Sequence, residues 1–353
     1  MKVTKEMGFI PADTTITLGD PVFIDVGRAP FCVYGACSDY RRVPADVGAA
    51  TSEAVARLGS YSAGIRLKFK TDSDYIVLHA VLGKEEMNIY NTAYLGSYGF
   101  DLFKKNSEGK YEVAGAFIPS QGQGKDYIES RVRVGEGMKE FLIHFPLYAG
   151  VEKCSIALRE GSTLEAPDNY KYETPVVFYG SSIVNGSCAS VPGSAYPSII
   201  SRMIDTDFIN LGFGGAALAE NAIIDYIKGL PMSVFVYDYD HNAPNPEYLE
   251  KTHYAAYLRF REARPDVPVI MASKPDYYSD PETNEIRRQI IISSYNKALA
   301  SGDKLVSFVD GKTMYPEECR NFATADGCHP NDMGYFLMAK AIGAKVKEYL
   351  ENS

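Results

Sequence analysis

The chain has 353 residues, more than the roughly 250 to 300 at which a single hydrophobic core stops growing, so two domains are expected. Hydrophobic residues make up 46% and charged residues 23%, which is typical of a globular protein and not of a disordered one. The formal net charge of -9 argues against a nucleic-acid partner, and we expect none, because affinity for phosphate backbones comes from clustered Lys and Arg.

The N-terminal segment, residues 1–19, carries charges at Lys2, Lys5 and Glu6 and has no apolar core of signal-peptide length. No later stretch approaches the length and apolarity of a membrane span. We therefore expect a protein that is cytoplasmic by default and has no membrane partner. Export stays open, because a secretion signal can be removed from a chain, and so does the oligomeric state.

Six cysteines are scattered along the chain without a CxxC pair or a Cys-His array. The sequence therefore predicts neither a structural zinc site nor a disulfide framework. Cys188 and Cys328 flank the motifs described below, but a cysteine nucleophile would leave the neighbouring serine motif unexplained.

From about residue 65 to residue 160, the hydrophobic pattern has mostly period two and is broken at near-regular intervals. Short strands at this spacing predict an all-β, jelly-roll-like sandwich. The expected strands cover residues 65–69, 75–82, 99–103, 113–118, 127–134, 141–145 and 155–158. The polar stretch 105–110 is predicted to be a hairpin loop between two of them.

The pattern changes at the polar segment 161–173, so we place a β-sandwich domain at residues 1–165 and a second domain at residues 174–353. In the second domain, continuous apolar strands alternate with helical patterns, which predicts an α/β fold with a parallel sheet and helices on both faces. Its expected strands cover residues 175–179, 208–211, 234–238, 269–272 and 305–310. A final helix starting near Asp332 has one apolar stripe, which we expect to pack against the sheet.

Chemically active residues follow four strands of this domain, as expected where the carboxyl ends of parallel strands meet. In the run 180–186, glycines bracket two serines at a strand-to-helix turn, which exposes a serine and leaves its NH at a helix N-terminus. In the run 210–215, small residues let a backbone NH approach a reacting oxygen. The run 238–242 places the amide of Asn242 beside the same cleft.

The fourth run, residues 326–330, contains an aspartate three residues ahead of a histidine. Asp326 can accept a hydrogen bond from Nδ1 of His329 and hold the imidazole toward a serine. Together the four runs supply a nucleophile, a base, an orienting carboxylate and oxyanion donors.

In this order, the four runs resemble the sequence blocks of the SGNH, or GDSL-type, hydrolases, and the resemblance covers about residues 175 to 353. It implies a flavodoxin-like catalytic domain and a serine esterase. The register of the first block assigns the nucleophile to Ser182, and the DxxHP block assigns the base and its partner to His329 and Asp326. The second and third blocks place the oxyanion donors at Gly215 and Asn242.

The run Gly99–Phe103 resembles the GxDLY motif of a β-sandwich domain that precedes one branch of these hydrolases. Three positions depart from the usual patterns. Ser181 stands where the first block usually has aspartate, Asp240 where the third often has glycine, and Phe103 where the sandwich motif has tyrosine. We take the first two as marks of a subfamily, because neither position carries the proton transfer.

The resemblance implies that Ser182 attacks an ester carbonyl while His329 takes its proton and Asp326 stabilises the imidazolium. The NH groups of Ser182 and Gly215 and the side chain of Asn242 would hold the oxyanion. No cofactor is implied, and we expect no metal, because Asp238 and Asp240 beside one histidine fall short of a recognisable ligand set.

The expected substrates are short acyl esters, acetyl above all, on a carbohydrate or other small molecule. The loops 242–248 and 273–278 are polar and aromatic, which suits hydroxyl-rich ligands. Within and beside them, His241, Asp240 and Lys274 are candidate substrate-binding residues. Sandwich domains often accompany enzymes that act on glycans, which points the same way by analogy.

Three alternatives remain. The same triad would serve an acyltransferase if a hydroxyl compound replaced water. The run 212–217 fits the GxGxxG/A fingerprint of an NAD(P)-binding oxidoreductase, with acidic Asp238 ending the next strand. A carbohydrate-binding protein without catalysis is the third alternative, against which the intact Ser/His/Asp set argues.

Overall fold

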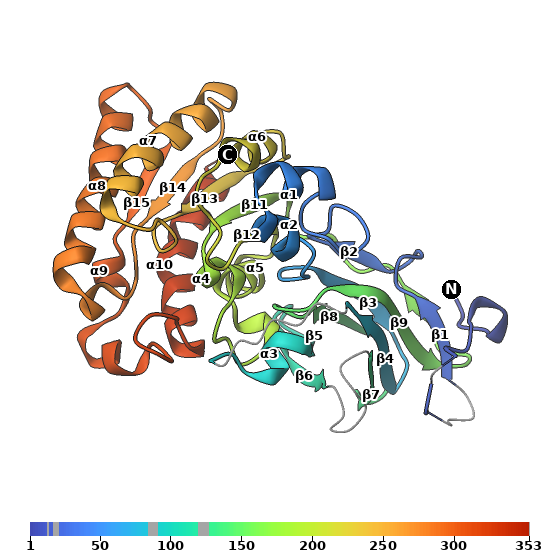
Figure 1. Ribbon diagram of the computed structural model, residues 1–353. Coiled ribbons are helices and arrows are strands. Elements are labelled where there is room, and N and C mark those ends of the chain that lie inside the picture. Colours follow the sequence, from blue (N-terminus) through green and yellow to red (C-terminus); the bar gives the residue numbers. More distant parts are fainter. Residues whose placement is uncertain (13, 17–20, 84–90, 119–126, 353) are drawn as a thin grey trace. The chain divides into compact units, whose positions relative to one another are not determined.

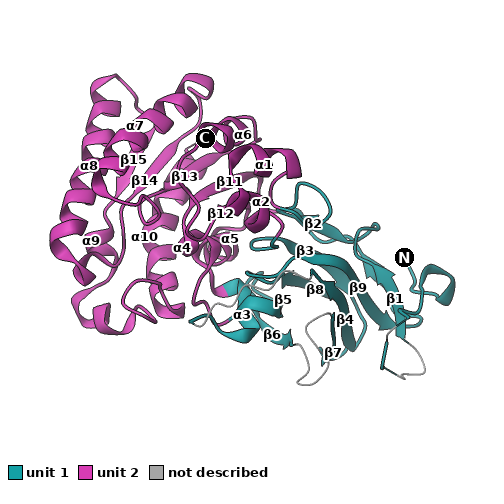
Figure 2. Cartoon of the chain, viewed as in Figure 1, with its two compact units in different colours: residues 1–41, 61–169, 191–193 teal, residues 42–60, 170–190, 194–353 magenta. Residues whose placement is uncertain are grey.

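The computed structural model describes residues 1–12, 14–16, 21–83, 91–118 and 127–352, and Figure 2 shows that it divides into two compact units. Unit 1 consists of residues 1–41, 61–169 and 191–193, and unit 2 of residues 42–60, 170–190 and 194–353. In the described part of the chain, no helix is both long enough and apolar enough to cross a membrane.

Unit 1 is a sandwich of two antiparallel sheets (Figure 1). The first has the order β1 (Pro21–Asp25), β9 (Val151–Arg159), β4 (Tyr75–Leu82) and β7 (Tyr127–Arg133). The second has the order β10 (Leu164–Glu165), β3 (Arg66–Thr71), β8 (Lys139–His144), β5 (Phe100–Lys105) and β6 (Tyr111–Phe117), with β2 (Cys32–Tyr34) paired to β3. Alternate residues of both sheets form one buried core, among them Leu78, Ile156, Leu67 and Phe141. Unit 1 also contains the short helices η1 (Lys5–Met7) and α3 (Tyr94–Tyr98).

The β-sandwich predicted from the period-two pattern is confirmed. The seven expected strands correspond to β3 through β9, and the polar stretch 105–110 joins β5 to β6, with Lys105 opposite Tyr111. The pattern missed β1, β2 and β10. Of these, β2 has three residues and β10 two, which is too short for an alternation to be seen.

The aspartate of the GxDLY-like run is a buried anchor inside unit 1. Asp101 Oδ1 accepts a hydrogen bond from His144 Nδ1 at 2.6 Å, and Oδ2 accepts one from the backbone NH of Gly193 at 2.5 Å. A Cβ on Gly193 would lie 2.7 Å from Asp101 Oδ2 and 2.9 Å from His144 Nδ1, so only glycine fits there. The motif therefore holds segment 191–193 in unit 1.

Unit 2 is built on a five-stranded parallel sheet. Its order is β12 (Thr206–Gly212), β11 (Tyr172–Gly180), β13 (Val234–Asp238), β14 (Val269–Ala272) and β15 (Val306–Val309). Numbered in chain order, the strands lie in the order 2-1-3-4-5, which is the flavodoxin-like arrangement. The second strand is added on one side of the first and the later strands on the other, so the switch point lies between the first and third strands. The predicted fold class is confirmed, and the runs after β11 and β13, which contain predicted site residues, lie at this switch point.

Helices cover both faces of the sheet (Figure 1). Each connection between parallel strands is right-handed, and the connection from β11 to β12 crosses the sheet in the opposite direction to the later ones, so its helix lies on the opposite face. On one side α5 (Tyr196–Ile204) packs with α10 (Asp332–Glu351), and on the other α7 (Pro246–Ala263) packs between α6 (Asn221–Lys228) and α8 (Pro281–Ala300). Shorter helices of unit 2 are α4 (Ser182–Asn185), α9 (Gly311–Met314), η3 (Tyr277–Ser279) and η4 (Glu317–Phe322). The short helix η2 (Pro192–Ser194) has its first two residues in unit 1.

Segment 42–60 lies within the predicted first domain, 1–165, but the structure groups it with unit 2. It forms α1 (Ala45–Thr51) and α2 (Glu53–Leu58), and α1 packs on α6. The buried Arg42 donates hydrogen bonds to the carbonyl oxygens of Gly212 at 2.7 Å and Leu58 at 2.6 Å. Its guanidinium also lies 5.2 Å from the centroid of the Phe213 ring. Arg42 thus fixes the end of β12, which lies within the run 210–215 that contains the predicted oxyanion donor Gly215.

Candidate active site

The two serines of the turn between β11 and α4 differ in burial and in their hydrogen bonds. Ser181 is the N-cap of α4, with a buried side chain whose Oγ accepts a hydrogen bond from the NH of Ile183 at 3.2 Å. Ser182 is the first residue of the helix and is partly exposed. Its NH has no acceptor within the helix, because the first NH groups of a helix never do. The turn therefore buries one serine and presents the other.

Ser182, His329 and Asp326 form a continuous hydrogen-bonded chain. Ser182 Oγ lies 2.9 Å from His329 Nε2, and His329 Nδ1 lies 2.8 Å from Asp326 Oδ2. The other carboxylate oxygen, Asp326 Oδ1, accepts the backbone NH groups of Cys328 at 3.0 Å and His329 at 2.7 Å. With the carboxylate held in place, the ring proton sits on Nδ1 and the Nε2 lone pair faces the serine.

The loop before α10 is itself held by a cap. Asn331 Oδ1 accepts the NH of Gly334 at 3.2 Å, and Asn331 Nδ2 donates to the carbonyl of Phe322 at 2.6 Å. These bonds fix the position from which His329 reaches Ser182. The DxxHP spacing identified this loop from the sequence, because the contacts it makes are local.

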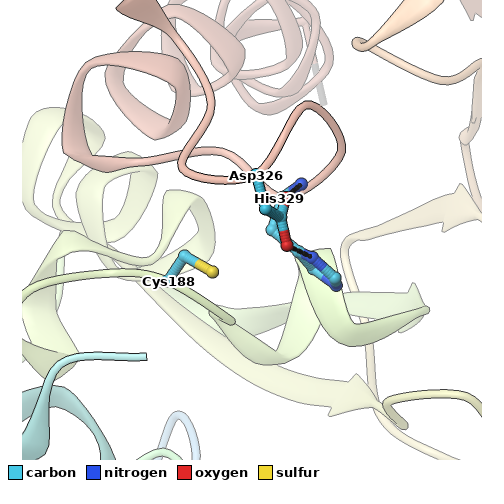
Figure 3. A group of neighbouring side chains, drawn as sticks. All are labelled: Cys188, Asp326 and His329. Atoms are coloured by element: carbon cyan, nitrogen blue, oxygen red, sulfur yellow. Dashed lines mark hydrogen bonds and ion pairs between the residues drawn. The ribbon is translucent and has the colours of Figure 1, made fainter. Parts of the chain in front are cut away.

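Cys188 is a neighbour of the histidine and aspartate (Figure 3). Its Sγ and one ligand atom each of Asp326 and His329 lie within 4.8 Å of one another. A second such group joins His241, Asp276 and Cys328. Burial, helped by the charge of Asp276, raises the pKa of the Cys328 thiol to about 12, so this cysteine is a neutral thiol near neutral pH.

The candidate oxyanion donors lie in the loops after β12 and β13. Gly215 is exposed in a turn with φ +72°, a left-handed conformation that glycine adopts without strain. Asn242 Oδ1 accepts the backbone NH of Ala217 at 3.3 Å, which leaves its Nδ2 as the donor. Asn210 links the β12 loop to α4, since its Nδ2 donates to the carbonyl of Val184 at 2.7 Å.

His241 and Lys274, predicted as substrate-binding residues, converge on a third side chain. His241 Nε2 lies 2.8 Å from Asp276 Oδ1, and Lys274 Nζ lies 3.5 Å from Asp276 Oδ2. Burial alone would raise the pKa of Asp276, but the charges of His241 and Lys274 outweigh it and hold the pKa below its usual range. Sequence reasoning missed Asp276, although its position just after β14 was a usable signal.

The structure does not present Asp240 to a substrate. Its side chain is fully buried, with Oδ2 accepting the NH of Lys274 at 3.0 Å and Oδ1 3.3 Å from Arg287 Nη1. Burial raises the pKa of Asp240, partly offset by His241, Lys274 and Arg287. Asp240 therefore supports the loop after β13, which argues against the predicted contact with substrate.

Asp238 is also buried, and its Oδ2 accepts a hydrogen bond from Tyr196 at 3.0 Å. Burial raises its pKa to about 8, with the neighbouring Asp240 and Asp276 adding to the rise and the Tyr196 hydrogen bond opposing it. A buried carboxyl that is already bonded to Tyr196 does not suit the ribose contact of a dinucleotide-binding protein.

The glycine fingerprint at 212–217 does not open a helix. Residues 214–216 form a turn, and α6 begins only at Asn221. The NH of Gly212 is already bonded to Asn210 Oδ1 at 2.9 Å. A dinucleotide site needs the glycines at a helix N-terminus, where the helix dipole and free NH groups bind the pyrophosphate, so this arrangement does not support one.

The chain is similar to several solved structures. A GDSL-like lipase from Bacteroides ovatus ATCC 8483 is 24% identical with a TM-score of 0.84, over 94% of this chain and 98% of that one. A salicylyl-acyltransferase from a tetracycline biosynthetic pathway is 18% identical with a TM-score of 0.74, over 94% and 98%. An acetyl xylan esterase from the rumen bacterium Butyrivibrio proteoclasticus is 11% identical with a TM-score of 0.54, over 94% and 99%. At these identities the likeness establishes a shared fold alone.

Two sequence families match the chain, and no curated protein does. The GDSL-like Lipase/Acylhydrolase family matches residues 173–347, and the N-terminus of Esterase_SGNH_hydro-type matches residues 31–164. Each match falls on the part of the chain in which the corresponding motifs were found. The chain therefore belongs to the GDSL-like lipase/acylhydrolase family and is an SGNH-type hydrolase with the N-terminal domain of that type.

Proposed function

We propose that this hydrolase is a serine esterase that removes short acyl groups, acetyl above all, from carbohydrate esters. The observation that carries the proposal is the hydrogen-bonded chain from Ser182 Oγ through His329 to Asp326, with distances of 2.9 and 2.8 Å. Both distances lie within hydrogen-bond range, and this arrangement activates a serine hydroxyl for attack on a carbonyl.

In the proposed mechanism, His329 Nε2 takes the hydroxyl proton as Ser182 Oγ attacks the ester carbonyl, and Asp326 stabilises the imidazolium. The NH groups of Ser182 and Gly215 and the Asn242 amide hold the tetrahedral oxyanion. His329 then gives its proton to the alcohol oxygen as the C–O bond breaks, which leaves an acyl-enzyme. Water attacks this intermediate with His329 as base, and the carboxylic acid leaves as the serine is restored.

The preference for acetylated carbohydrates rests on the loops around the site. The loops 242–248 and 273–278 supply hydroxyl and amide groups, which can form hydrogen bonds with the hydroxyl groups of a sugar. One protein of the same fold is an acetyl xylan esterase, which supports the proposal by analogy. Long-chain esters would call for an apolar route to the serine instead.

Covalent labelling tests the proposal directly. The protein is treated with a serine-reactive phosphonate, and the adduct is located by mass spectrometry, while acetate release from acetylated monosaccharides is measured in parallel. We expect one adduct, on Ser182, and acetate release that the reagent blocks. An adduct elsewhere, or acetate release that continues after complete labelling of Ser182, would overturn the assignment.

A transferase remains the second candidate, because the acyl-enzyme can react with a hydroxyl compound in place of water, and one protein of this fold is a salicylyl-acyltransferase. The two are separated by adding sugar or phenol acceptors to the assay. Acetate as the main product supports the esterase, and an acylated acceptor as the main product supports the transferase.

A further inference from the structure

A pocket of about 280 Å³ lies beside the loop that carries Asp326. Residues from three parts of unit 2 line it, among them Asp276, Tyr278, Tyr315, Arg320, Thr324 and Gly327. Thr324 and Gly327 flank Asp326 in the chain, and Asp276 is bonded to His241, the neighbour of the candidate oxyanion donor Asn242. The pocket therefore borders the loop that carries Asp326 and His329, and one of its wall residues, Asp276, contacts the loop that carries Asn242.

Arg320 brings an uncompensated positive charge to this pocket. Its guanidinium carbon lies 3.8 Å from the centroid of the Tyr278 ring, and its Nε donates to the carbonyl of Tyr315 at 3.3 Å. Among the described residues it forms no ion pair, and its two terminal nitrogens have no hydrogen-bond acceptor. Stacking on the ring holds the planar group in place with those nitrogens available to a ligand.

The one acid in the pocket wall does not neutralise Arg320. Asp276 is nearly fully buried, at 2% exposure of its side chain, and its two oxygens already face His241 at 2.8 Å and Lys274 at 3.5 Å. In a chain with a net charge of -9, this is a local site that favours an anion.

The proposed chemistry places the alcohol part of the ester beside the imidazole of His329. His329 must pass the proton that it took from Ser182 to the leaving oxygen, so the alcohol lies next to the imidazole. The loop 324–329, which carries that imidazole, forms part of the pocket wall. A volume of about 280 Å³ falls just below the roughly 300 to 1,000 Å³ of sites for drug-sized ligands, so a group the size of one sugar ring fits.

We infer that this pocket binds the alcohol part of the ester and that Arg320 recognises a carboxylate on it, so that the substrate class is an acylated uronic acid. The inference rests on the proposed esterase function. Arginine is suited to this task, because its fork of NH groups matches the two oxygens of a carboxylate. A neutral sugar would leave the guanidinium without a partner.

The test compares two substrates that differ only in charge: the methyl glycoside of acetylated glucuronic acid and that of glucose acetylated at the same position. We expect kcat/KM to favour the uronate by about 10- to 100-fold, the range of a charge-assisted hydrogen bond. Arg320→Gln should abolish this ratio, mainly through KM, and Arg320→Lys should keep part of it, because the charge remains and the fork is lost. Both substrates are measured on the same enzyme sample, so a loss of folded enzyme lowers both values of kcat/KM equally and leaves their ratio unchanged.

Arg259→Gln is the matched control, because it removes the same charge from α7, outside the pocket, where Arg259 forms an exposed ion pair with Asp225. It should keep the ratio. Added salt should lower the ratio for the unchanged enzyme, since salt screens the interaction. The inference would be overturned if the wild-type enzyme showed no preference for the uronate, or if Arg320→Gln left the ratio of the two kcat/KM values unchanged.

A binding measurement separates this inference from the proposed function. Methyl glucuronoside and methyl glucoside, both without the acyl group, are titrated calorimetrically into the Ser182→Ala protein with and without Arg320→Gln. Binding of the uronate that depends on Arg320 supports the pocket even if no ester is hydrolysed. Equal binding of the two sugars, or binding indifferent to Arg320, contradicts it even if the esterase is active.

Discussion

At the scale of single residues, the two serines of the turn between β11 and α4 make different contacts. Ser181 caps α4 through its bond to the NH of Ile183, while Ser182 faces His329. A cap contributes to stability, and a nucleophile contributes to the reaction, so the two substitutions should be distinguishable by their effects on different measurements.

Ser182→Ala should therefore abolish acetate release without lowering the melting temperature appreciably. Ser181→Ala should keep much of the activity and lower the free energy of unfolding by about 0.5 to 2 kcal/mol, the usual effect of losing a cap. Steady-state kinetics and urea unfolding of both variants check this. Loss of activity in a stable Ser181→Ala protein would reassign the nucleophile.

Asp238 predicts a pH dependence of stability. Its pKa is about 8 in the folded protein, mainly because of burial, against about 3.9 for an unfolded aspartate. Between these values the folded protein holds a proton that the unfolded chain lacks. The stabilising contribution of Asp238 to the free energy of unfolding is therefore fully present below pH 4 and is lost as the pH rises toward 8.

Replacing Asp238 by asparagine keeps an acceptor for Tyr196 and removes this titration. The stability of Asp238→Asn relative to the unchanged protein should rise between pH 5 and 8, by at most about 1.4 kcal/mol per pH unit. Urea unfolding at each pH unit measures the difference. Parallel stability curves for the two proteins would mean that Asp238 is ionised in the folded state throughout this range.

At the scale of elements, segment 42–60 supports the loop that carries Gly215. Arg42 donates to the carbonyl of Gly212, at the end of β12, and to that of Leu58, at the end of α2. A buried carbonyl that loses its donor costs about 1 to 3 kcal/mol, and the loop it anchors loses its fixed position. Stability and turnover should therefore fall together when this arginine is changed.

Arg42→Met keeps the apolar length of the side chain and removes both donors. We expect the free energy of unfolding to fall by roughly 2 kcal/mol or more and kcat to fall more than KM changes, because the oxyanion donors act in the transition state. Arg57→Met, an exposed position on α2, is the control and should change neither. An Arg42→Met enzyme with unaltered kcat would confine this residue to a structural role.

At the scale of the whole molecule, the sequence was informative wherever the signal was local. The period-two pattern located β3 through β9, and the DxxHP spacing located Asp326 and His329, because their contacts lie within a few residues. The grouping of segment 42–60 with unit 2 was not predicted, since Arg42 reaches a carbonyl that is 170 positions away in the chain. Asp276 and Arg320 were not among the predicted site residues for the same reason, because their contacts are with neighbours that only folding brings together.

The expectation that the reaction needs no metal can be tested on the intact chain. Within the described residues, two groups could hold an ion, but Asp326 is engaged by His329, and Asp276 by His241 and Lys274. Serine, histidine and aspartate suffice for acyl transfer without a Lewis acid. Dialysis against EDTA should leave the rate of acetate release unchanged, whereas loss of activity that Zn²⁺ restores would contradict the mechanism.

The last prediction concerns acyl chain length, for which the whole molecule supplies the argument. Esterases that act on long-chain lipids need an apolar path from a micelle or membrane surface, and this chain has a net charge of -9 and polar, aromatic loops around the proposed site. On p-nitrophenyl acetate, butyrate, octanoate and palmitate, kcat/KM should therefore be highest for acetate and fall with length. Ser182→Ala, measured on the same series, subtracts background hydrolysis. A maximum of kcat/KM at octanoate or beyond would refute the short-acyl preference. Efficient hydrolysis of p-nitrophenyl acetate without acetate release from any acetylated sugar would support an esterase and contradict a carbohydrate substrate.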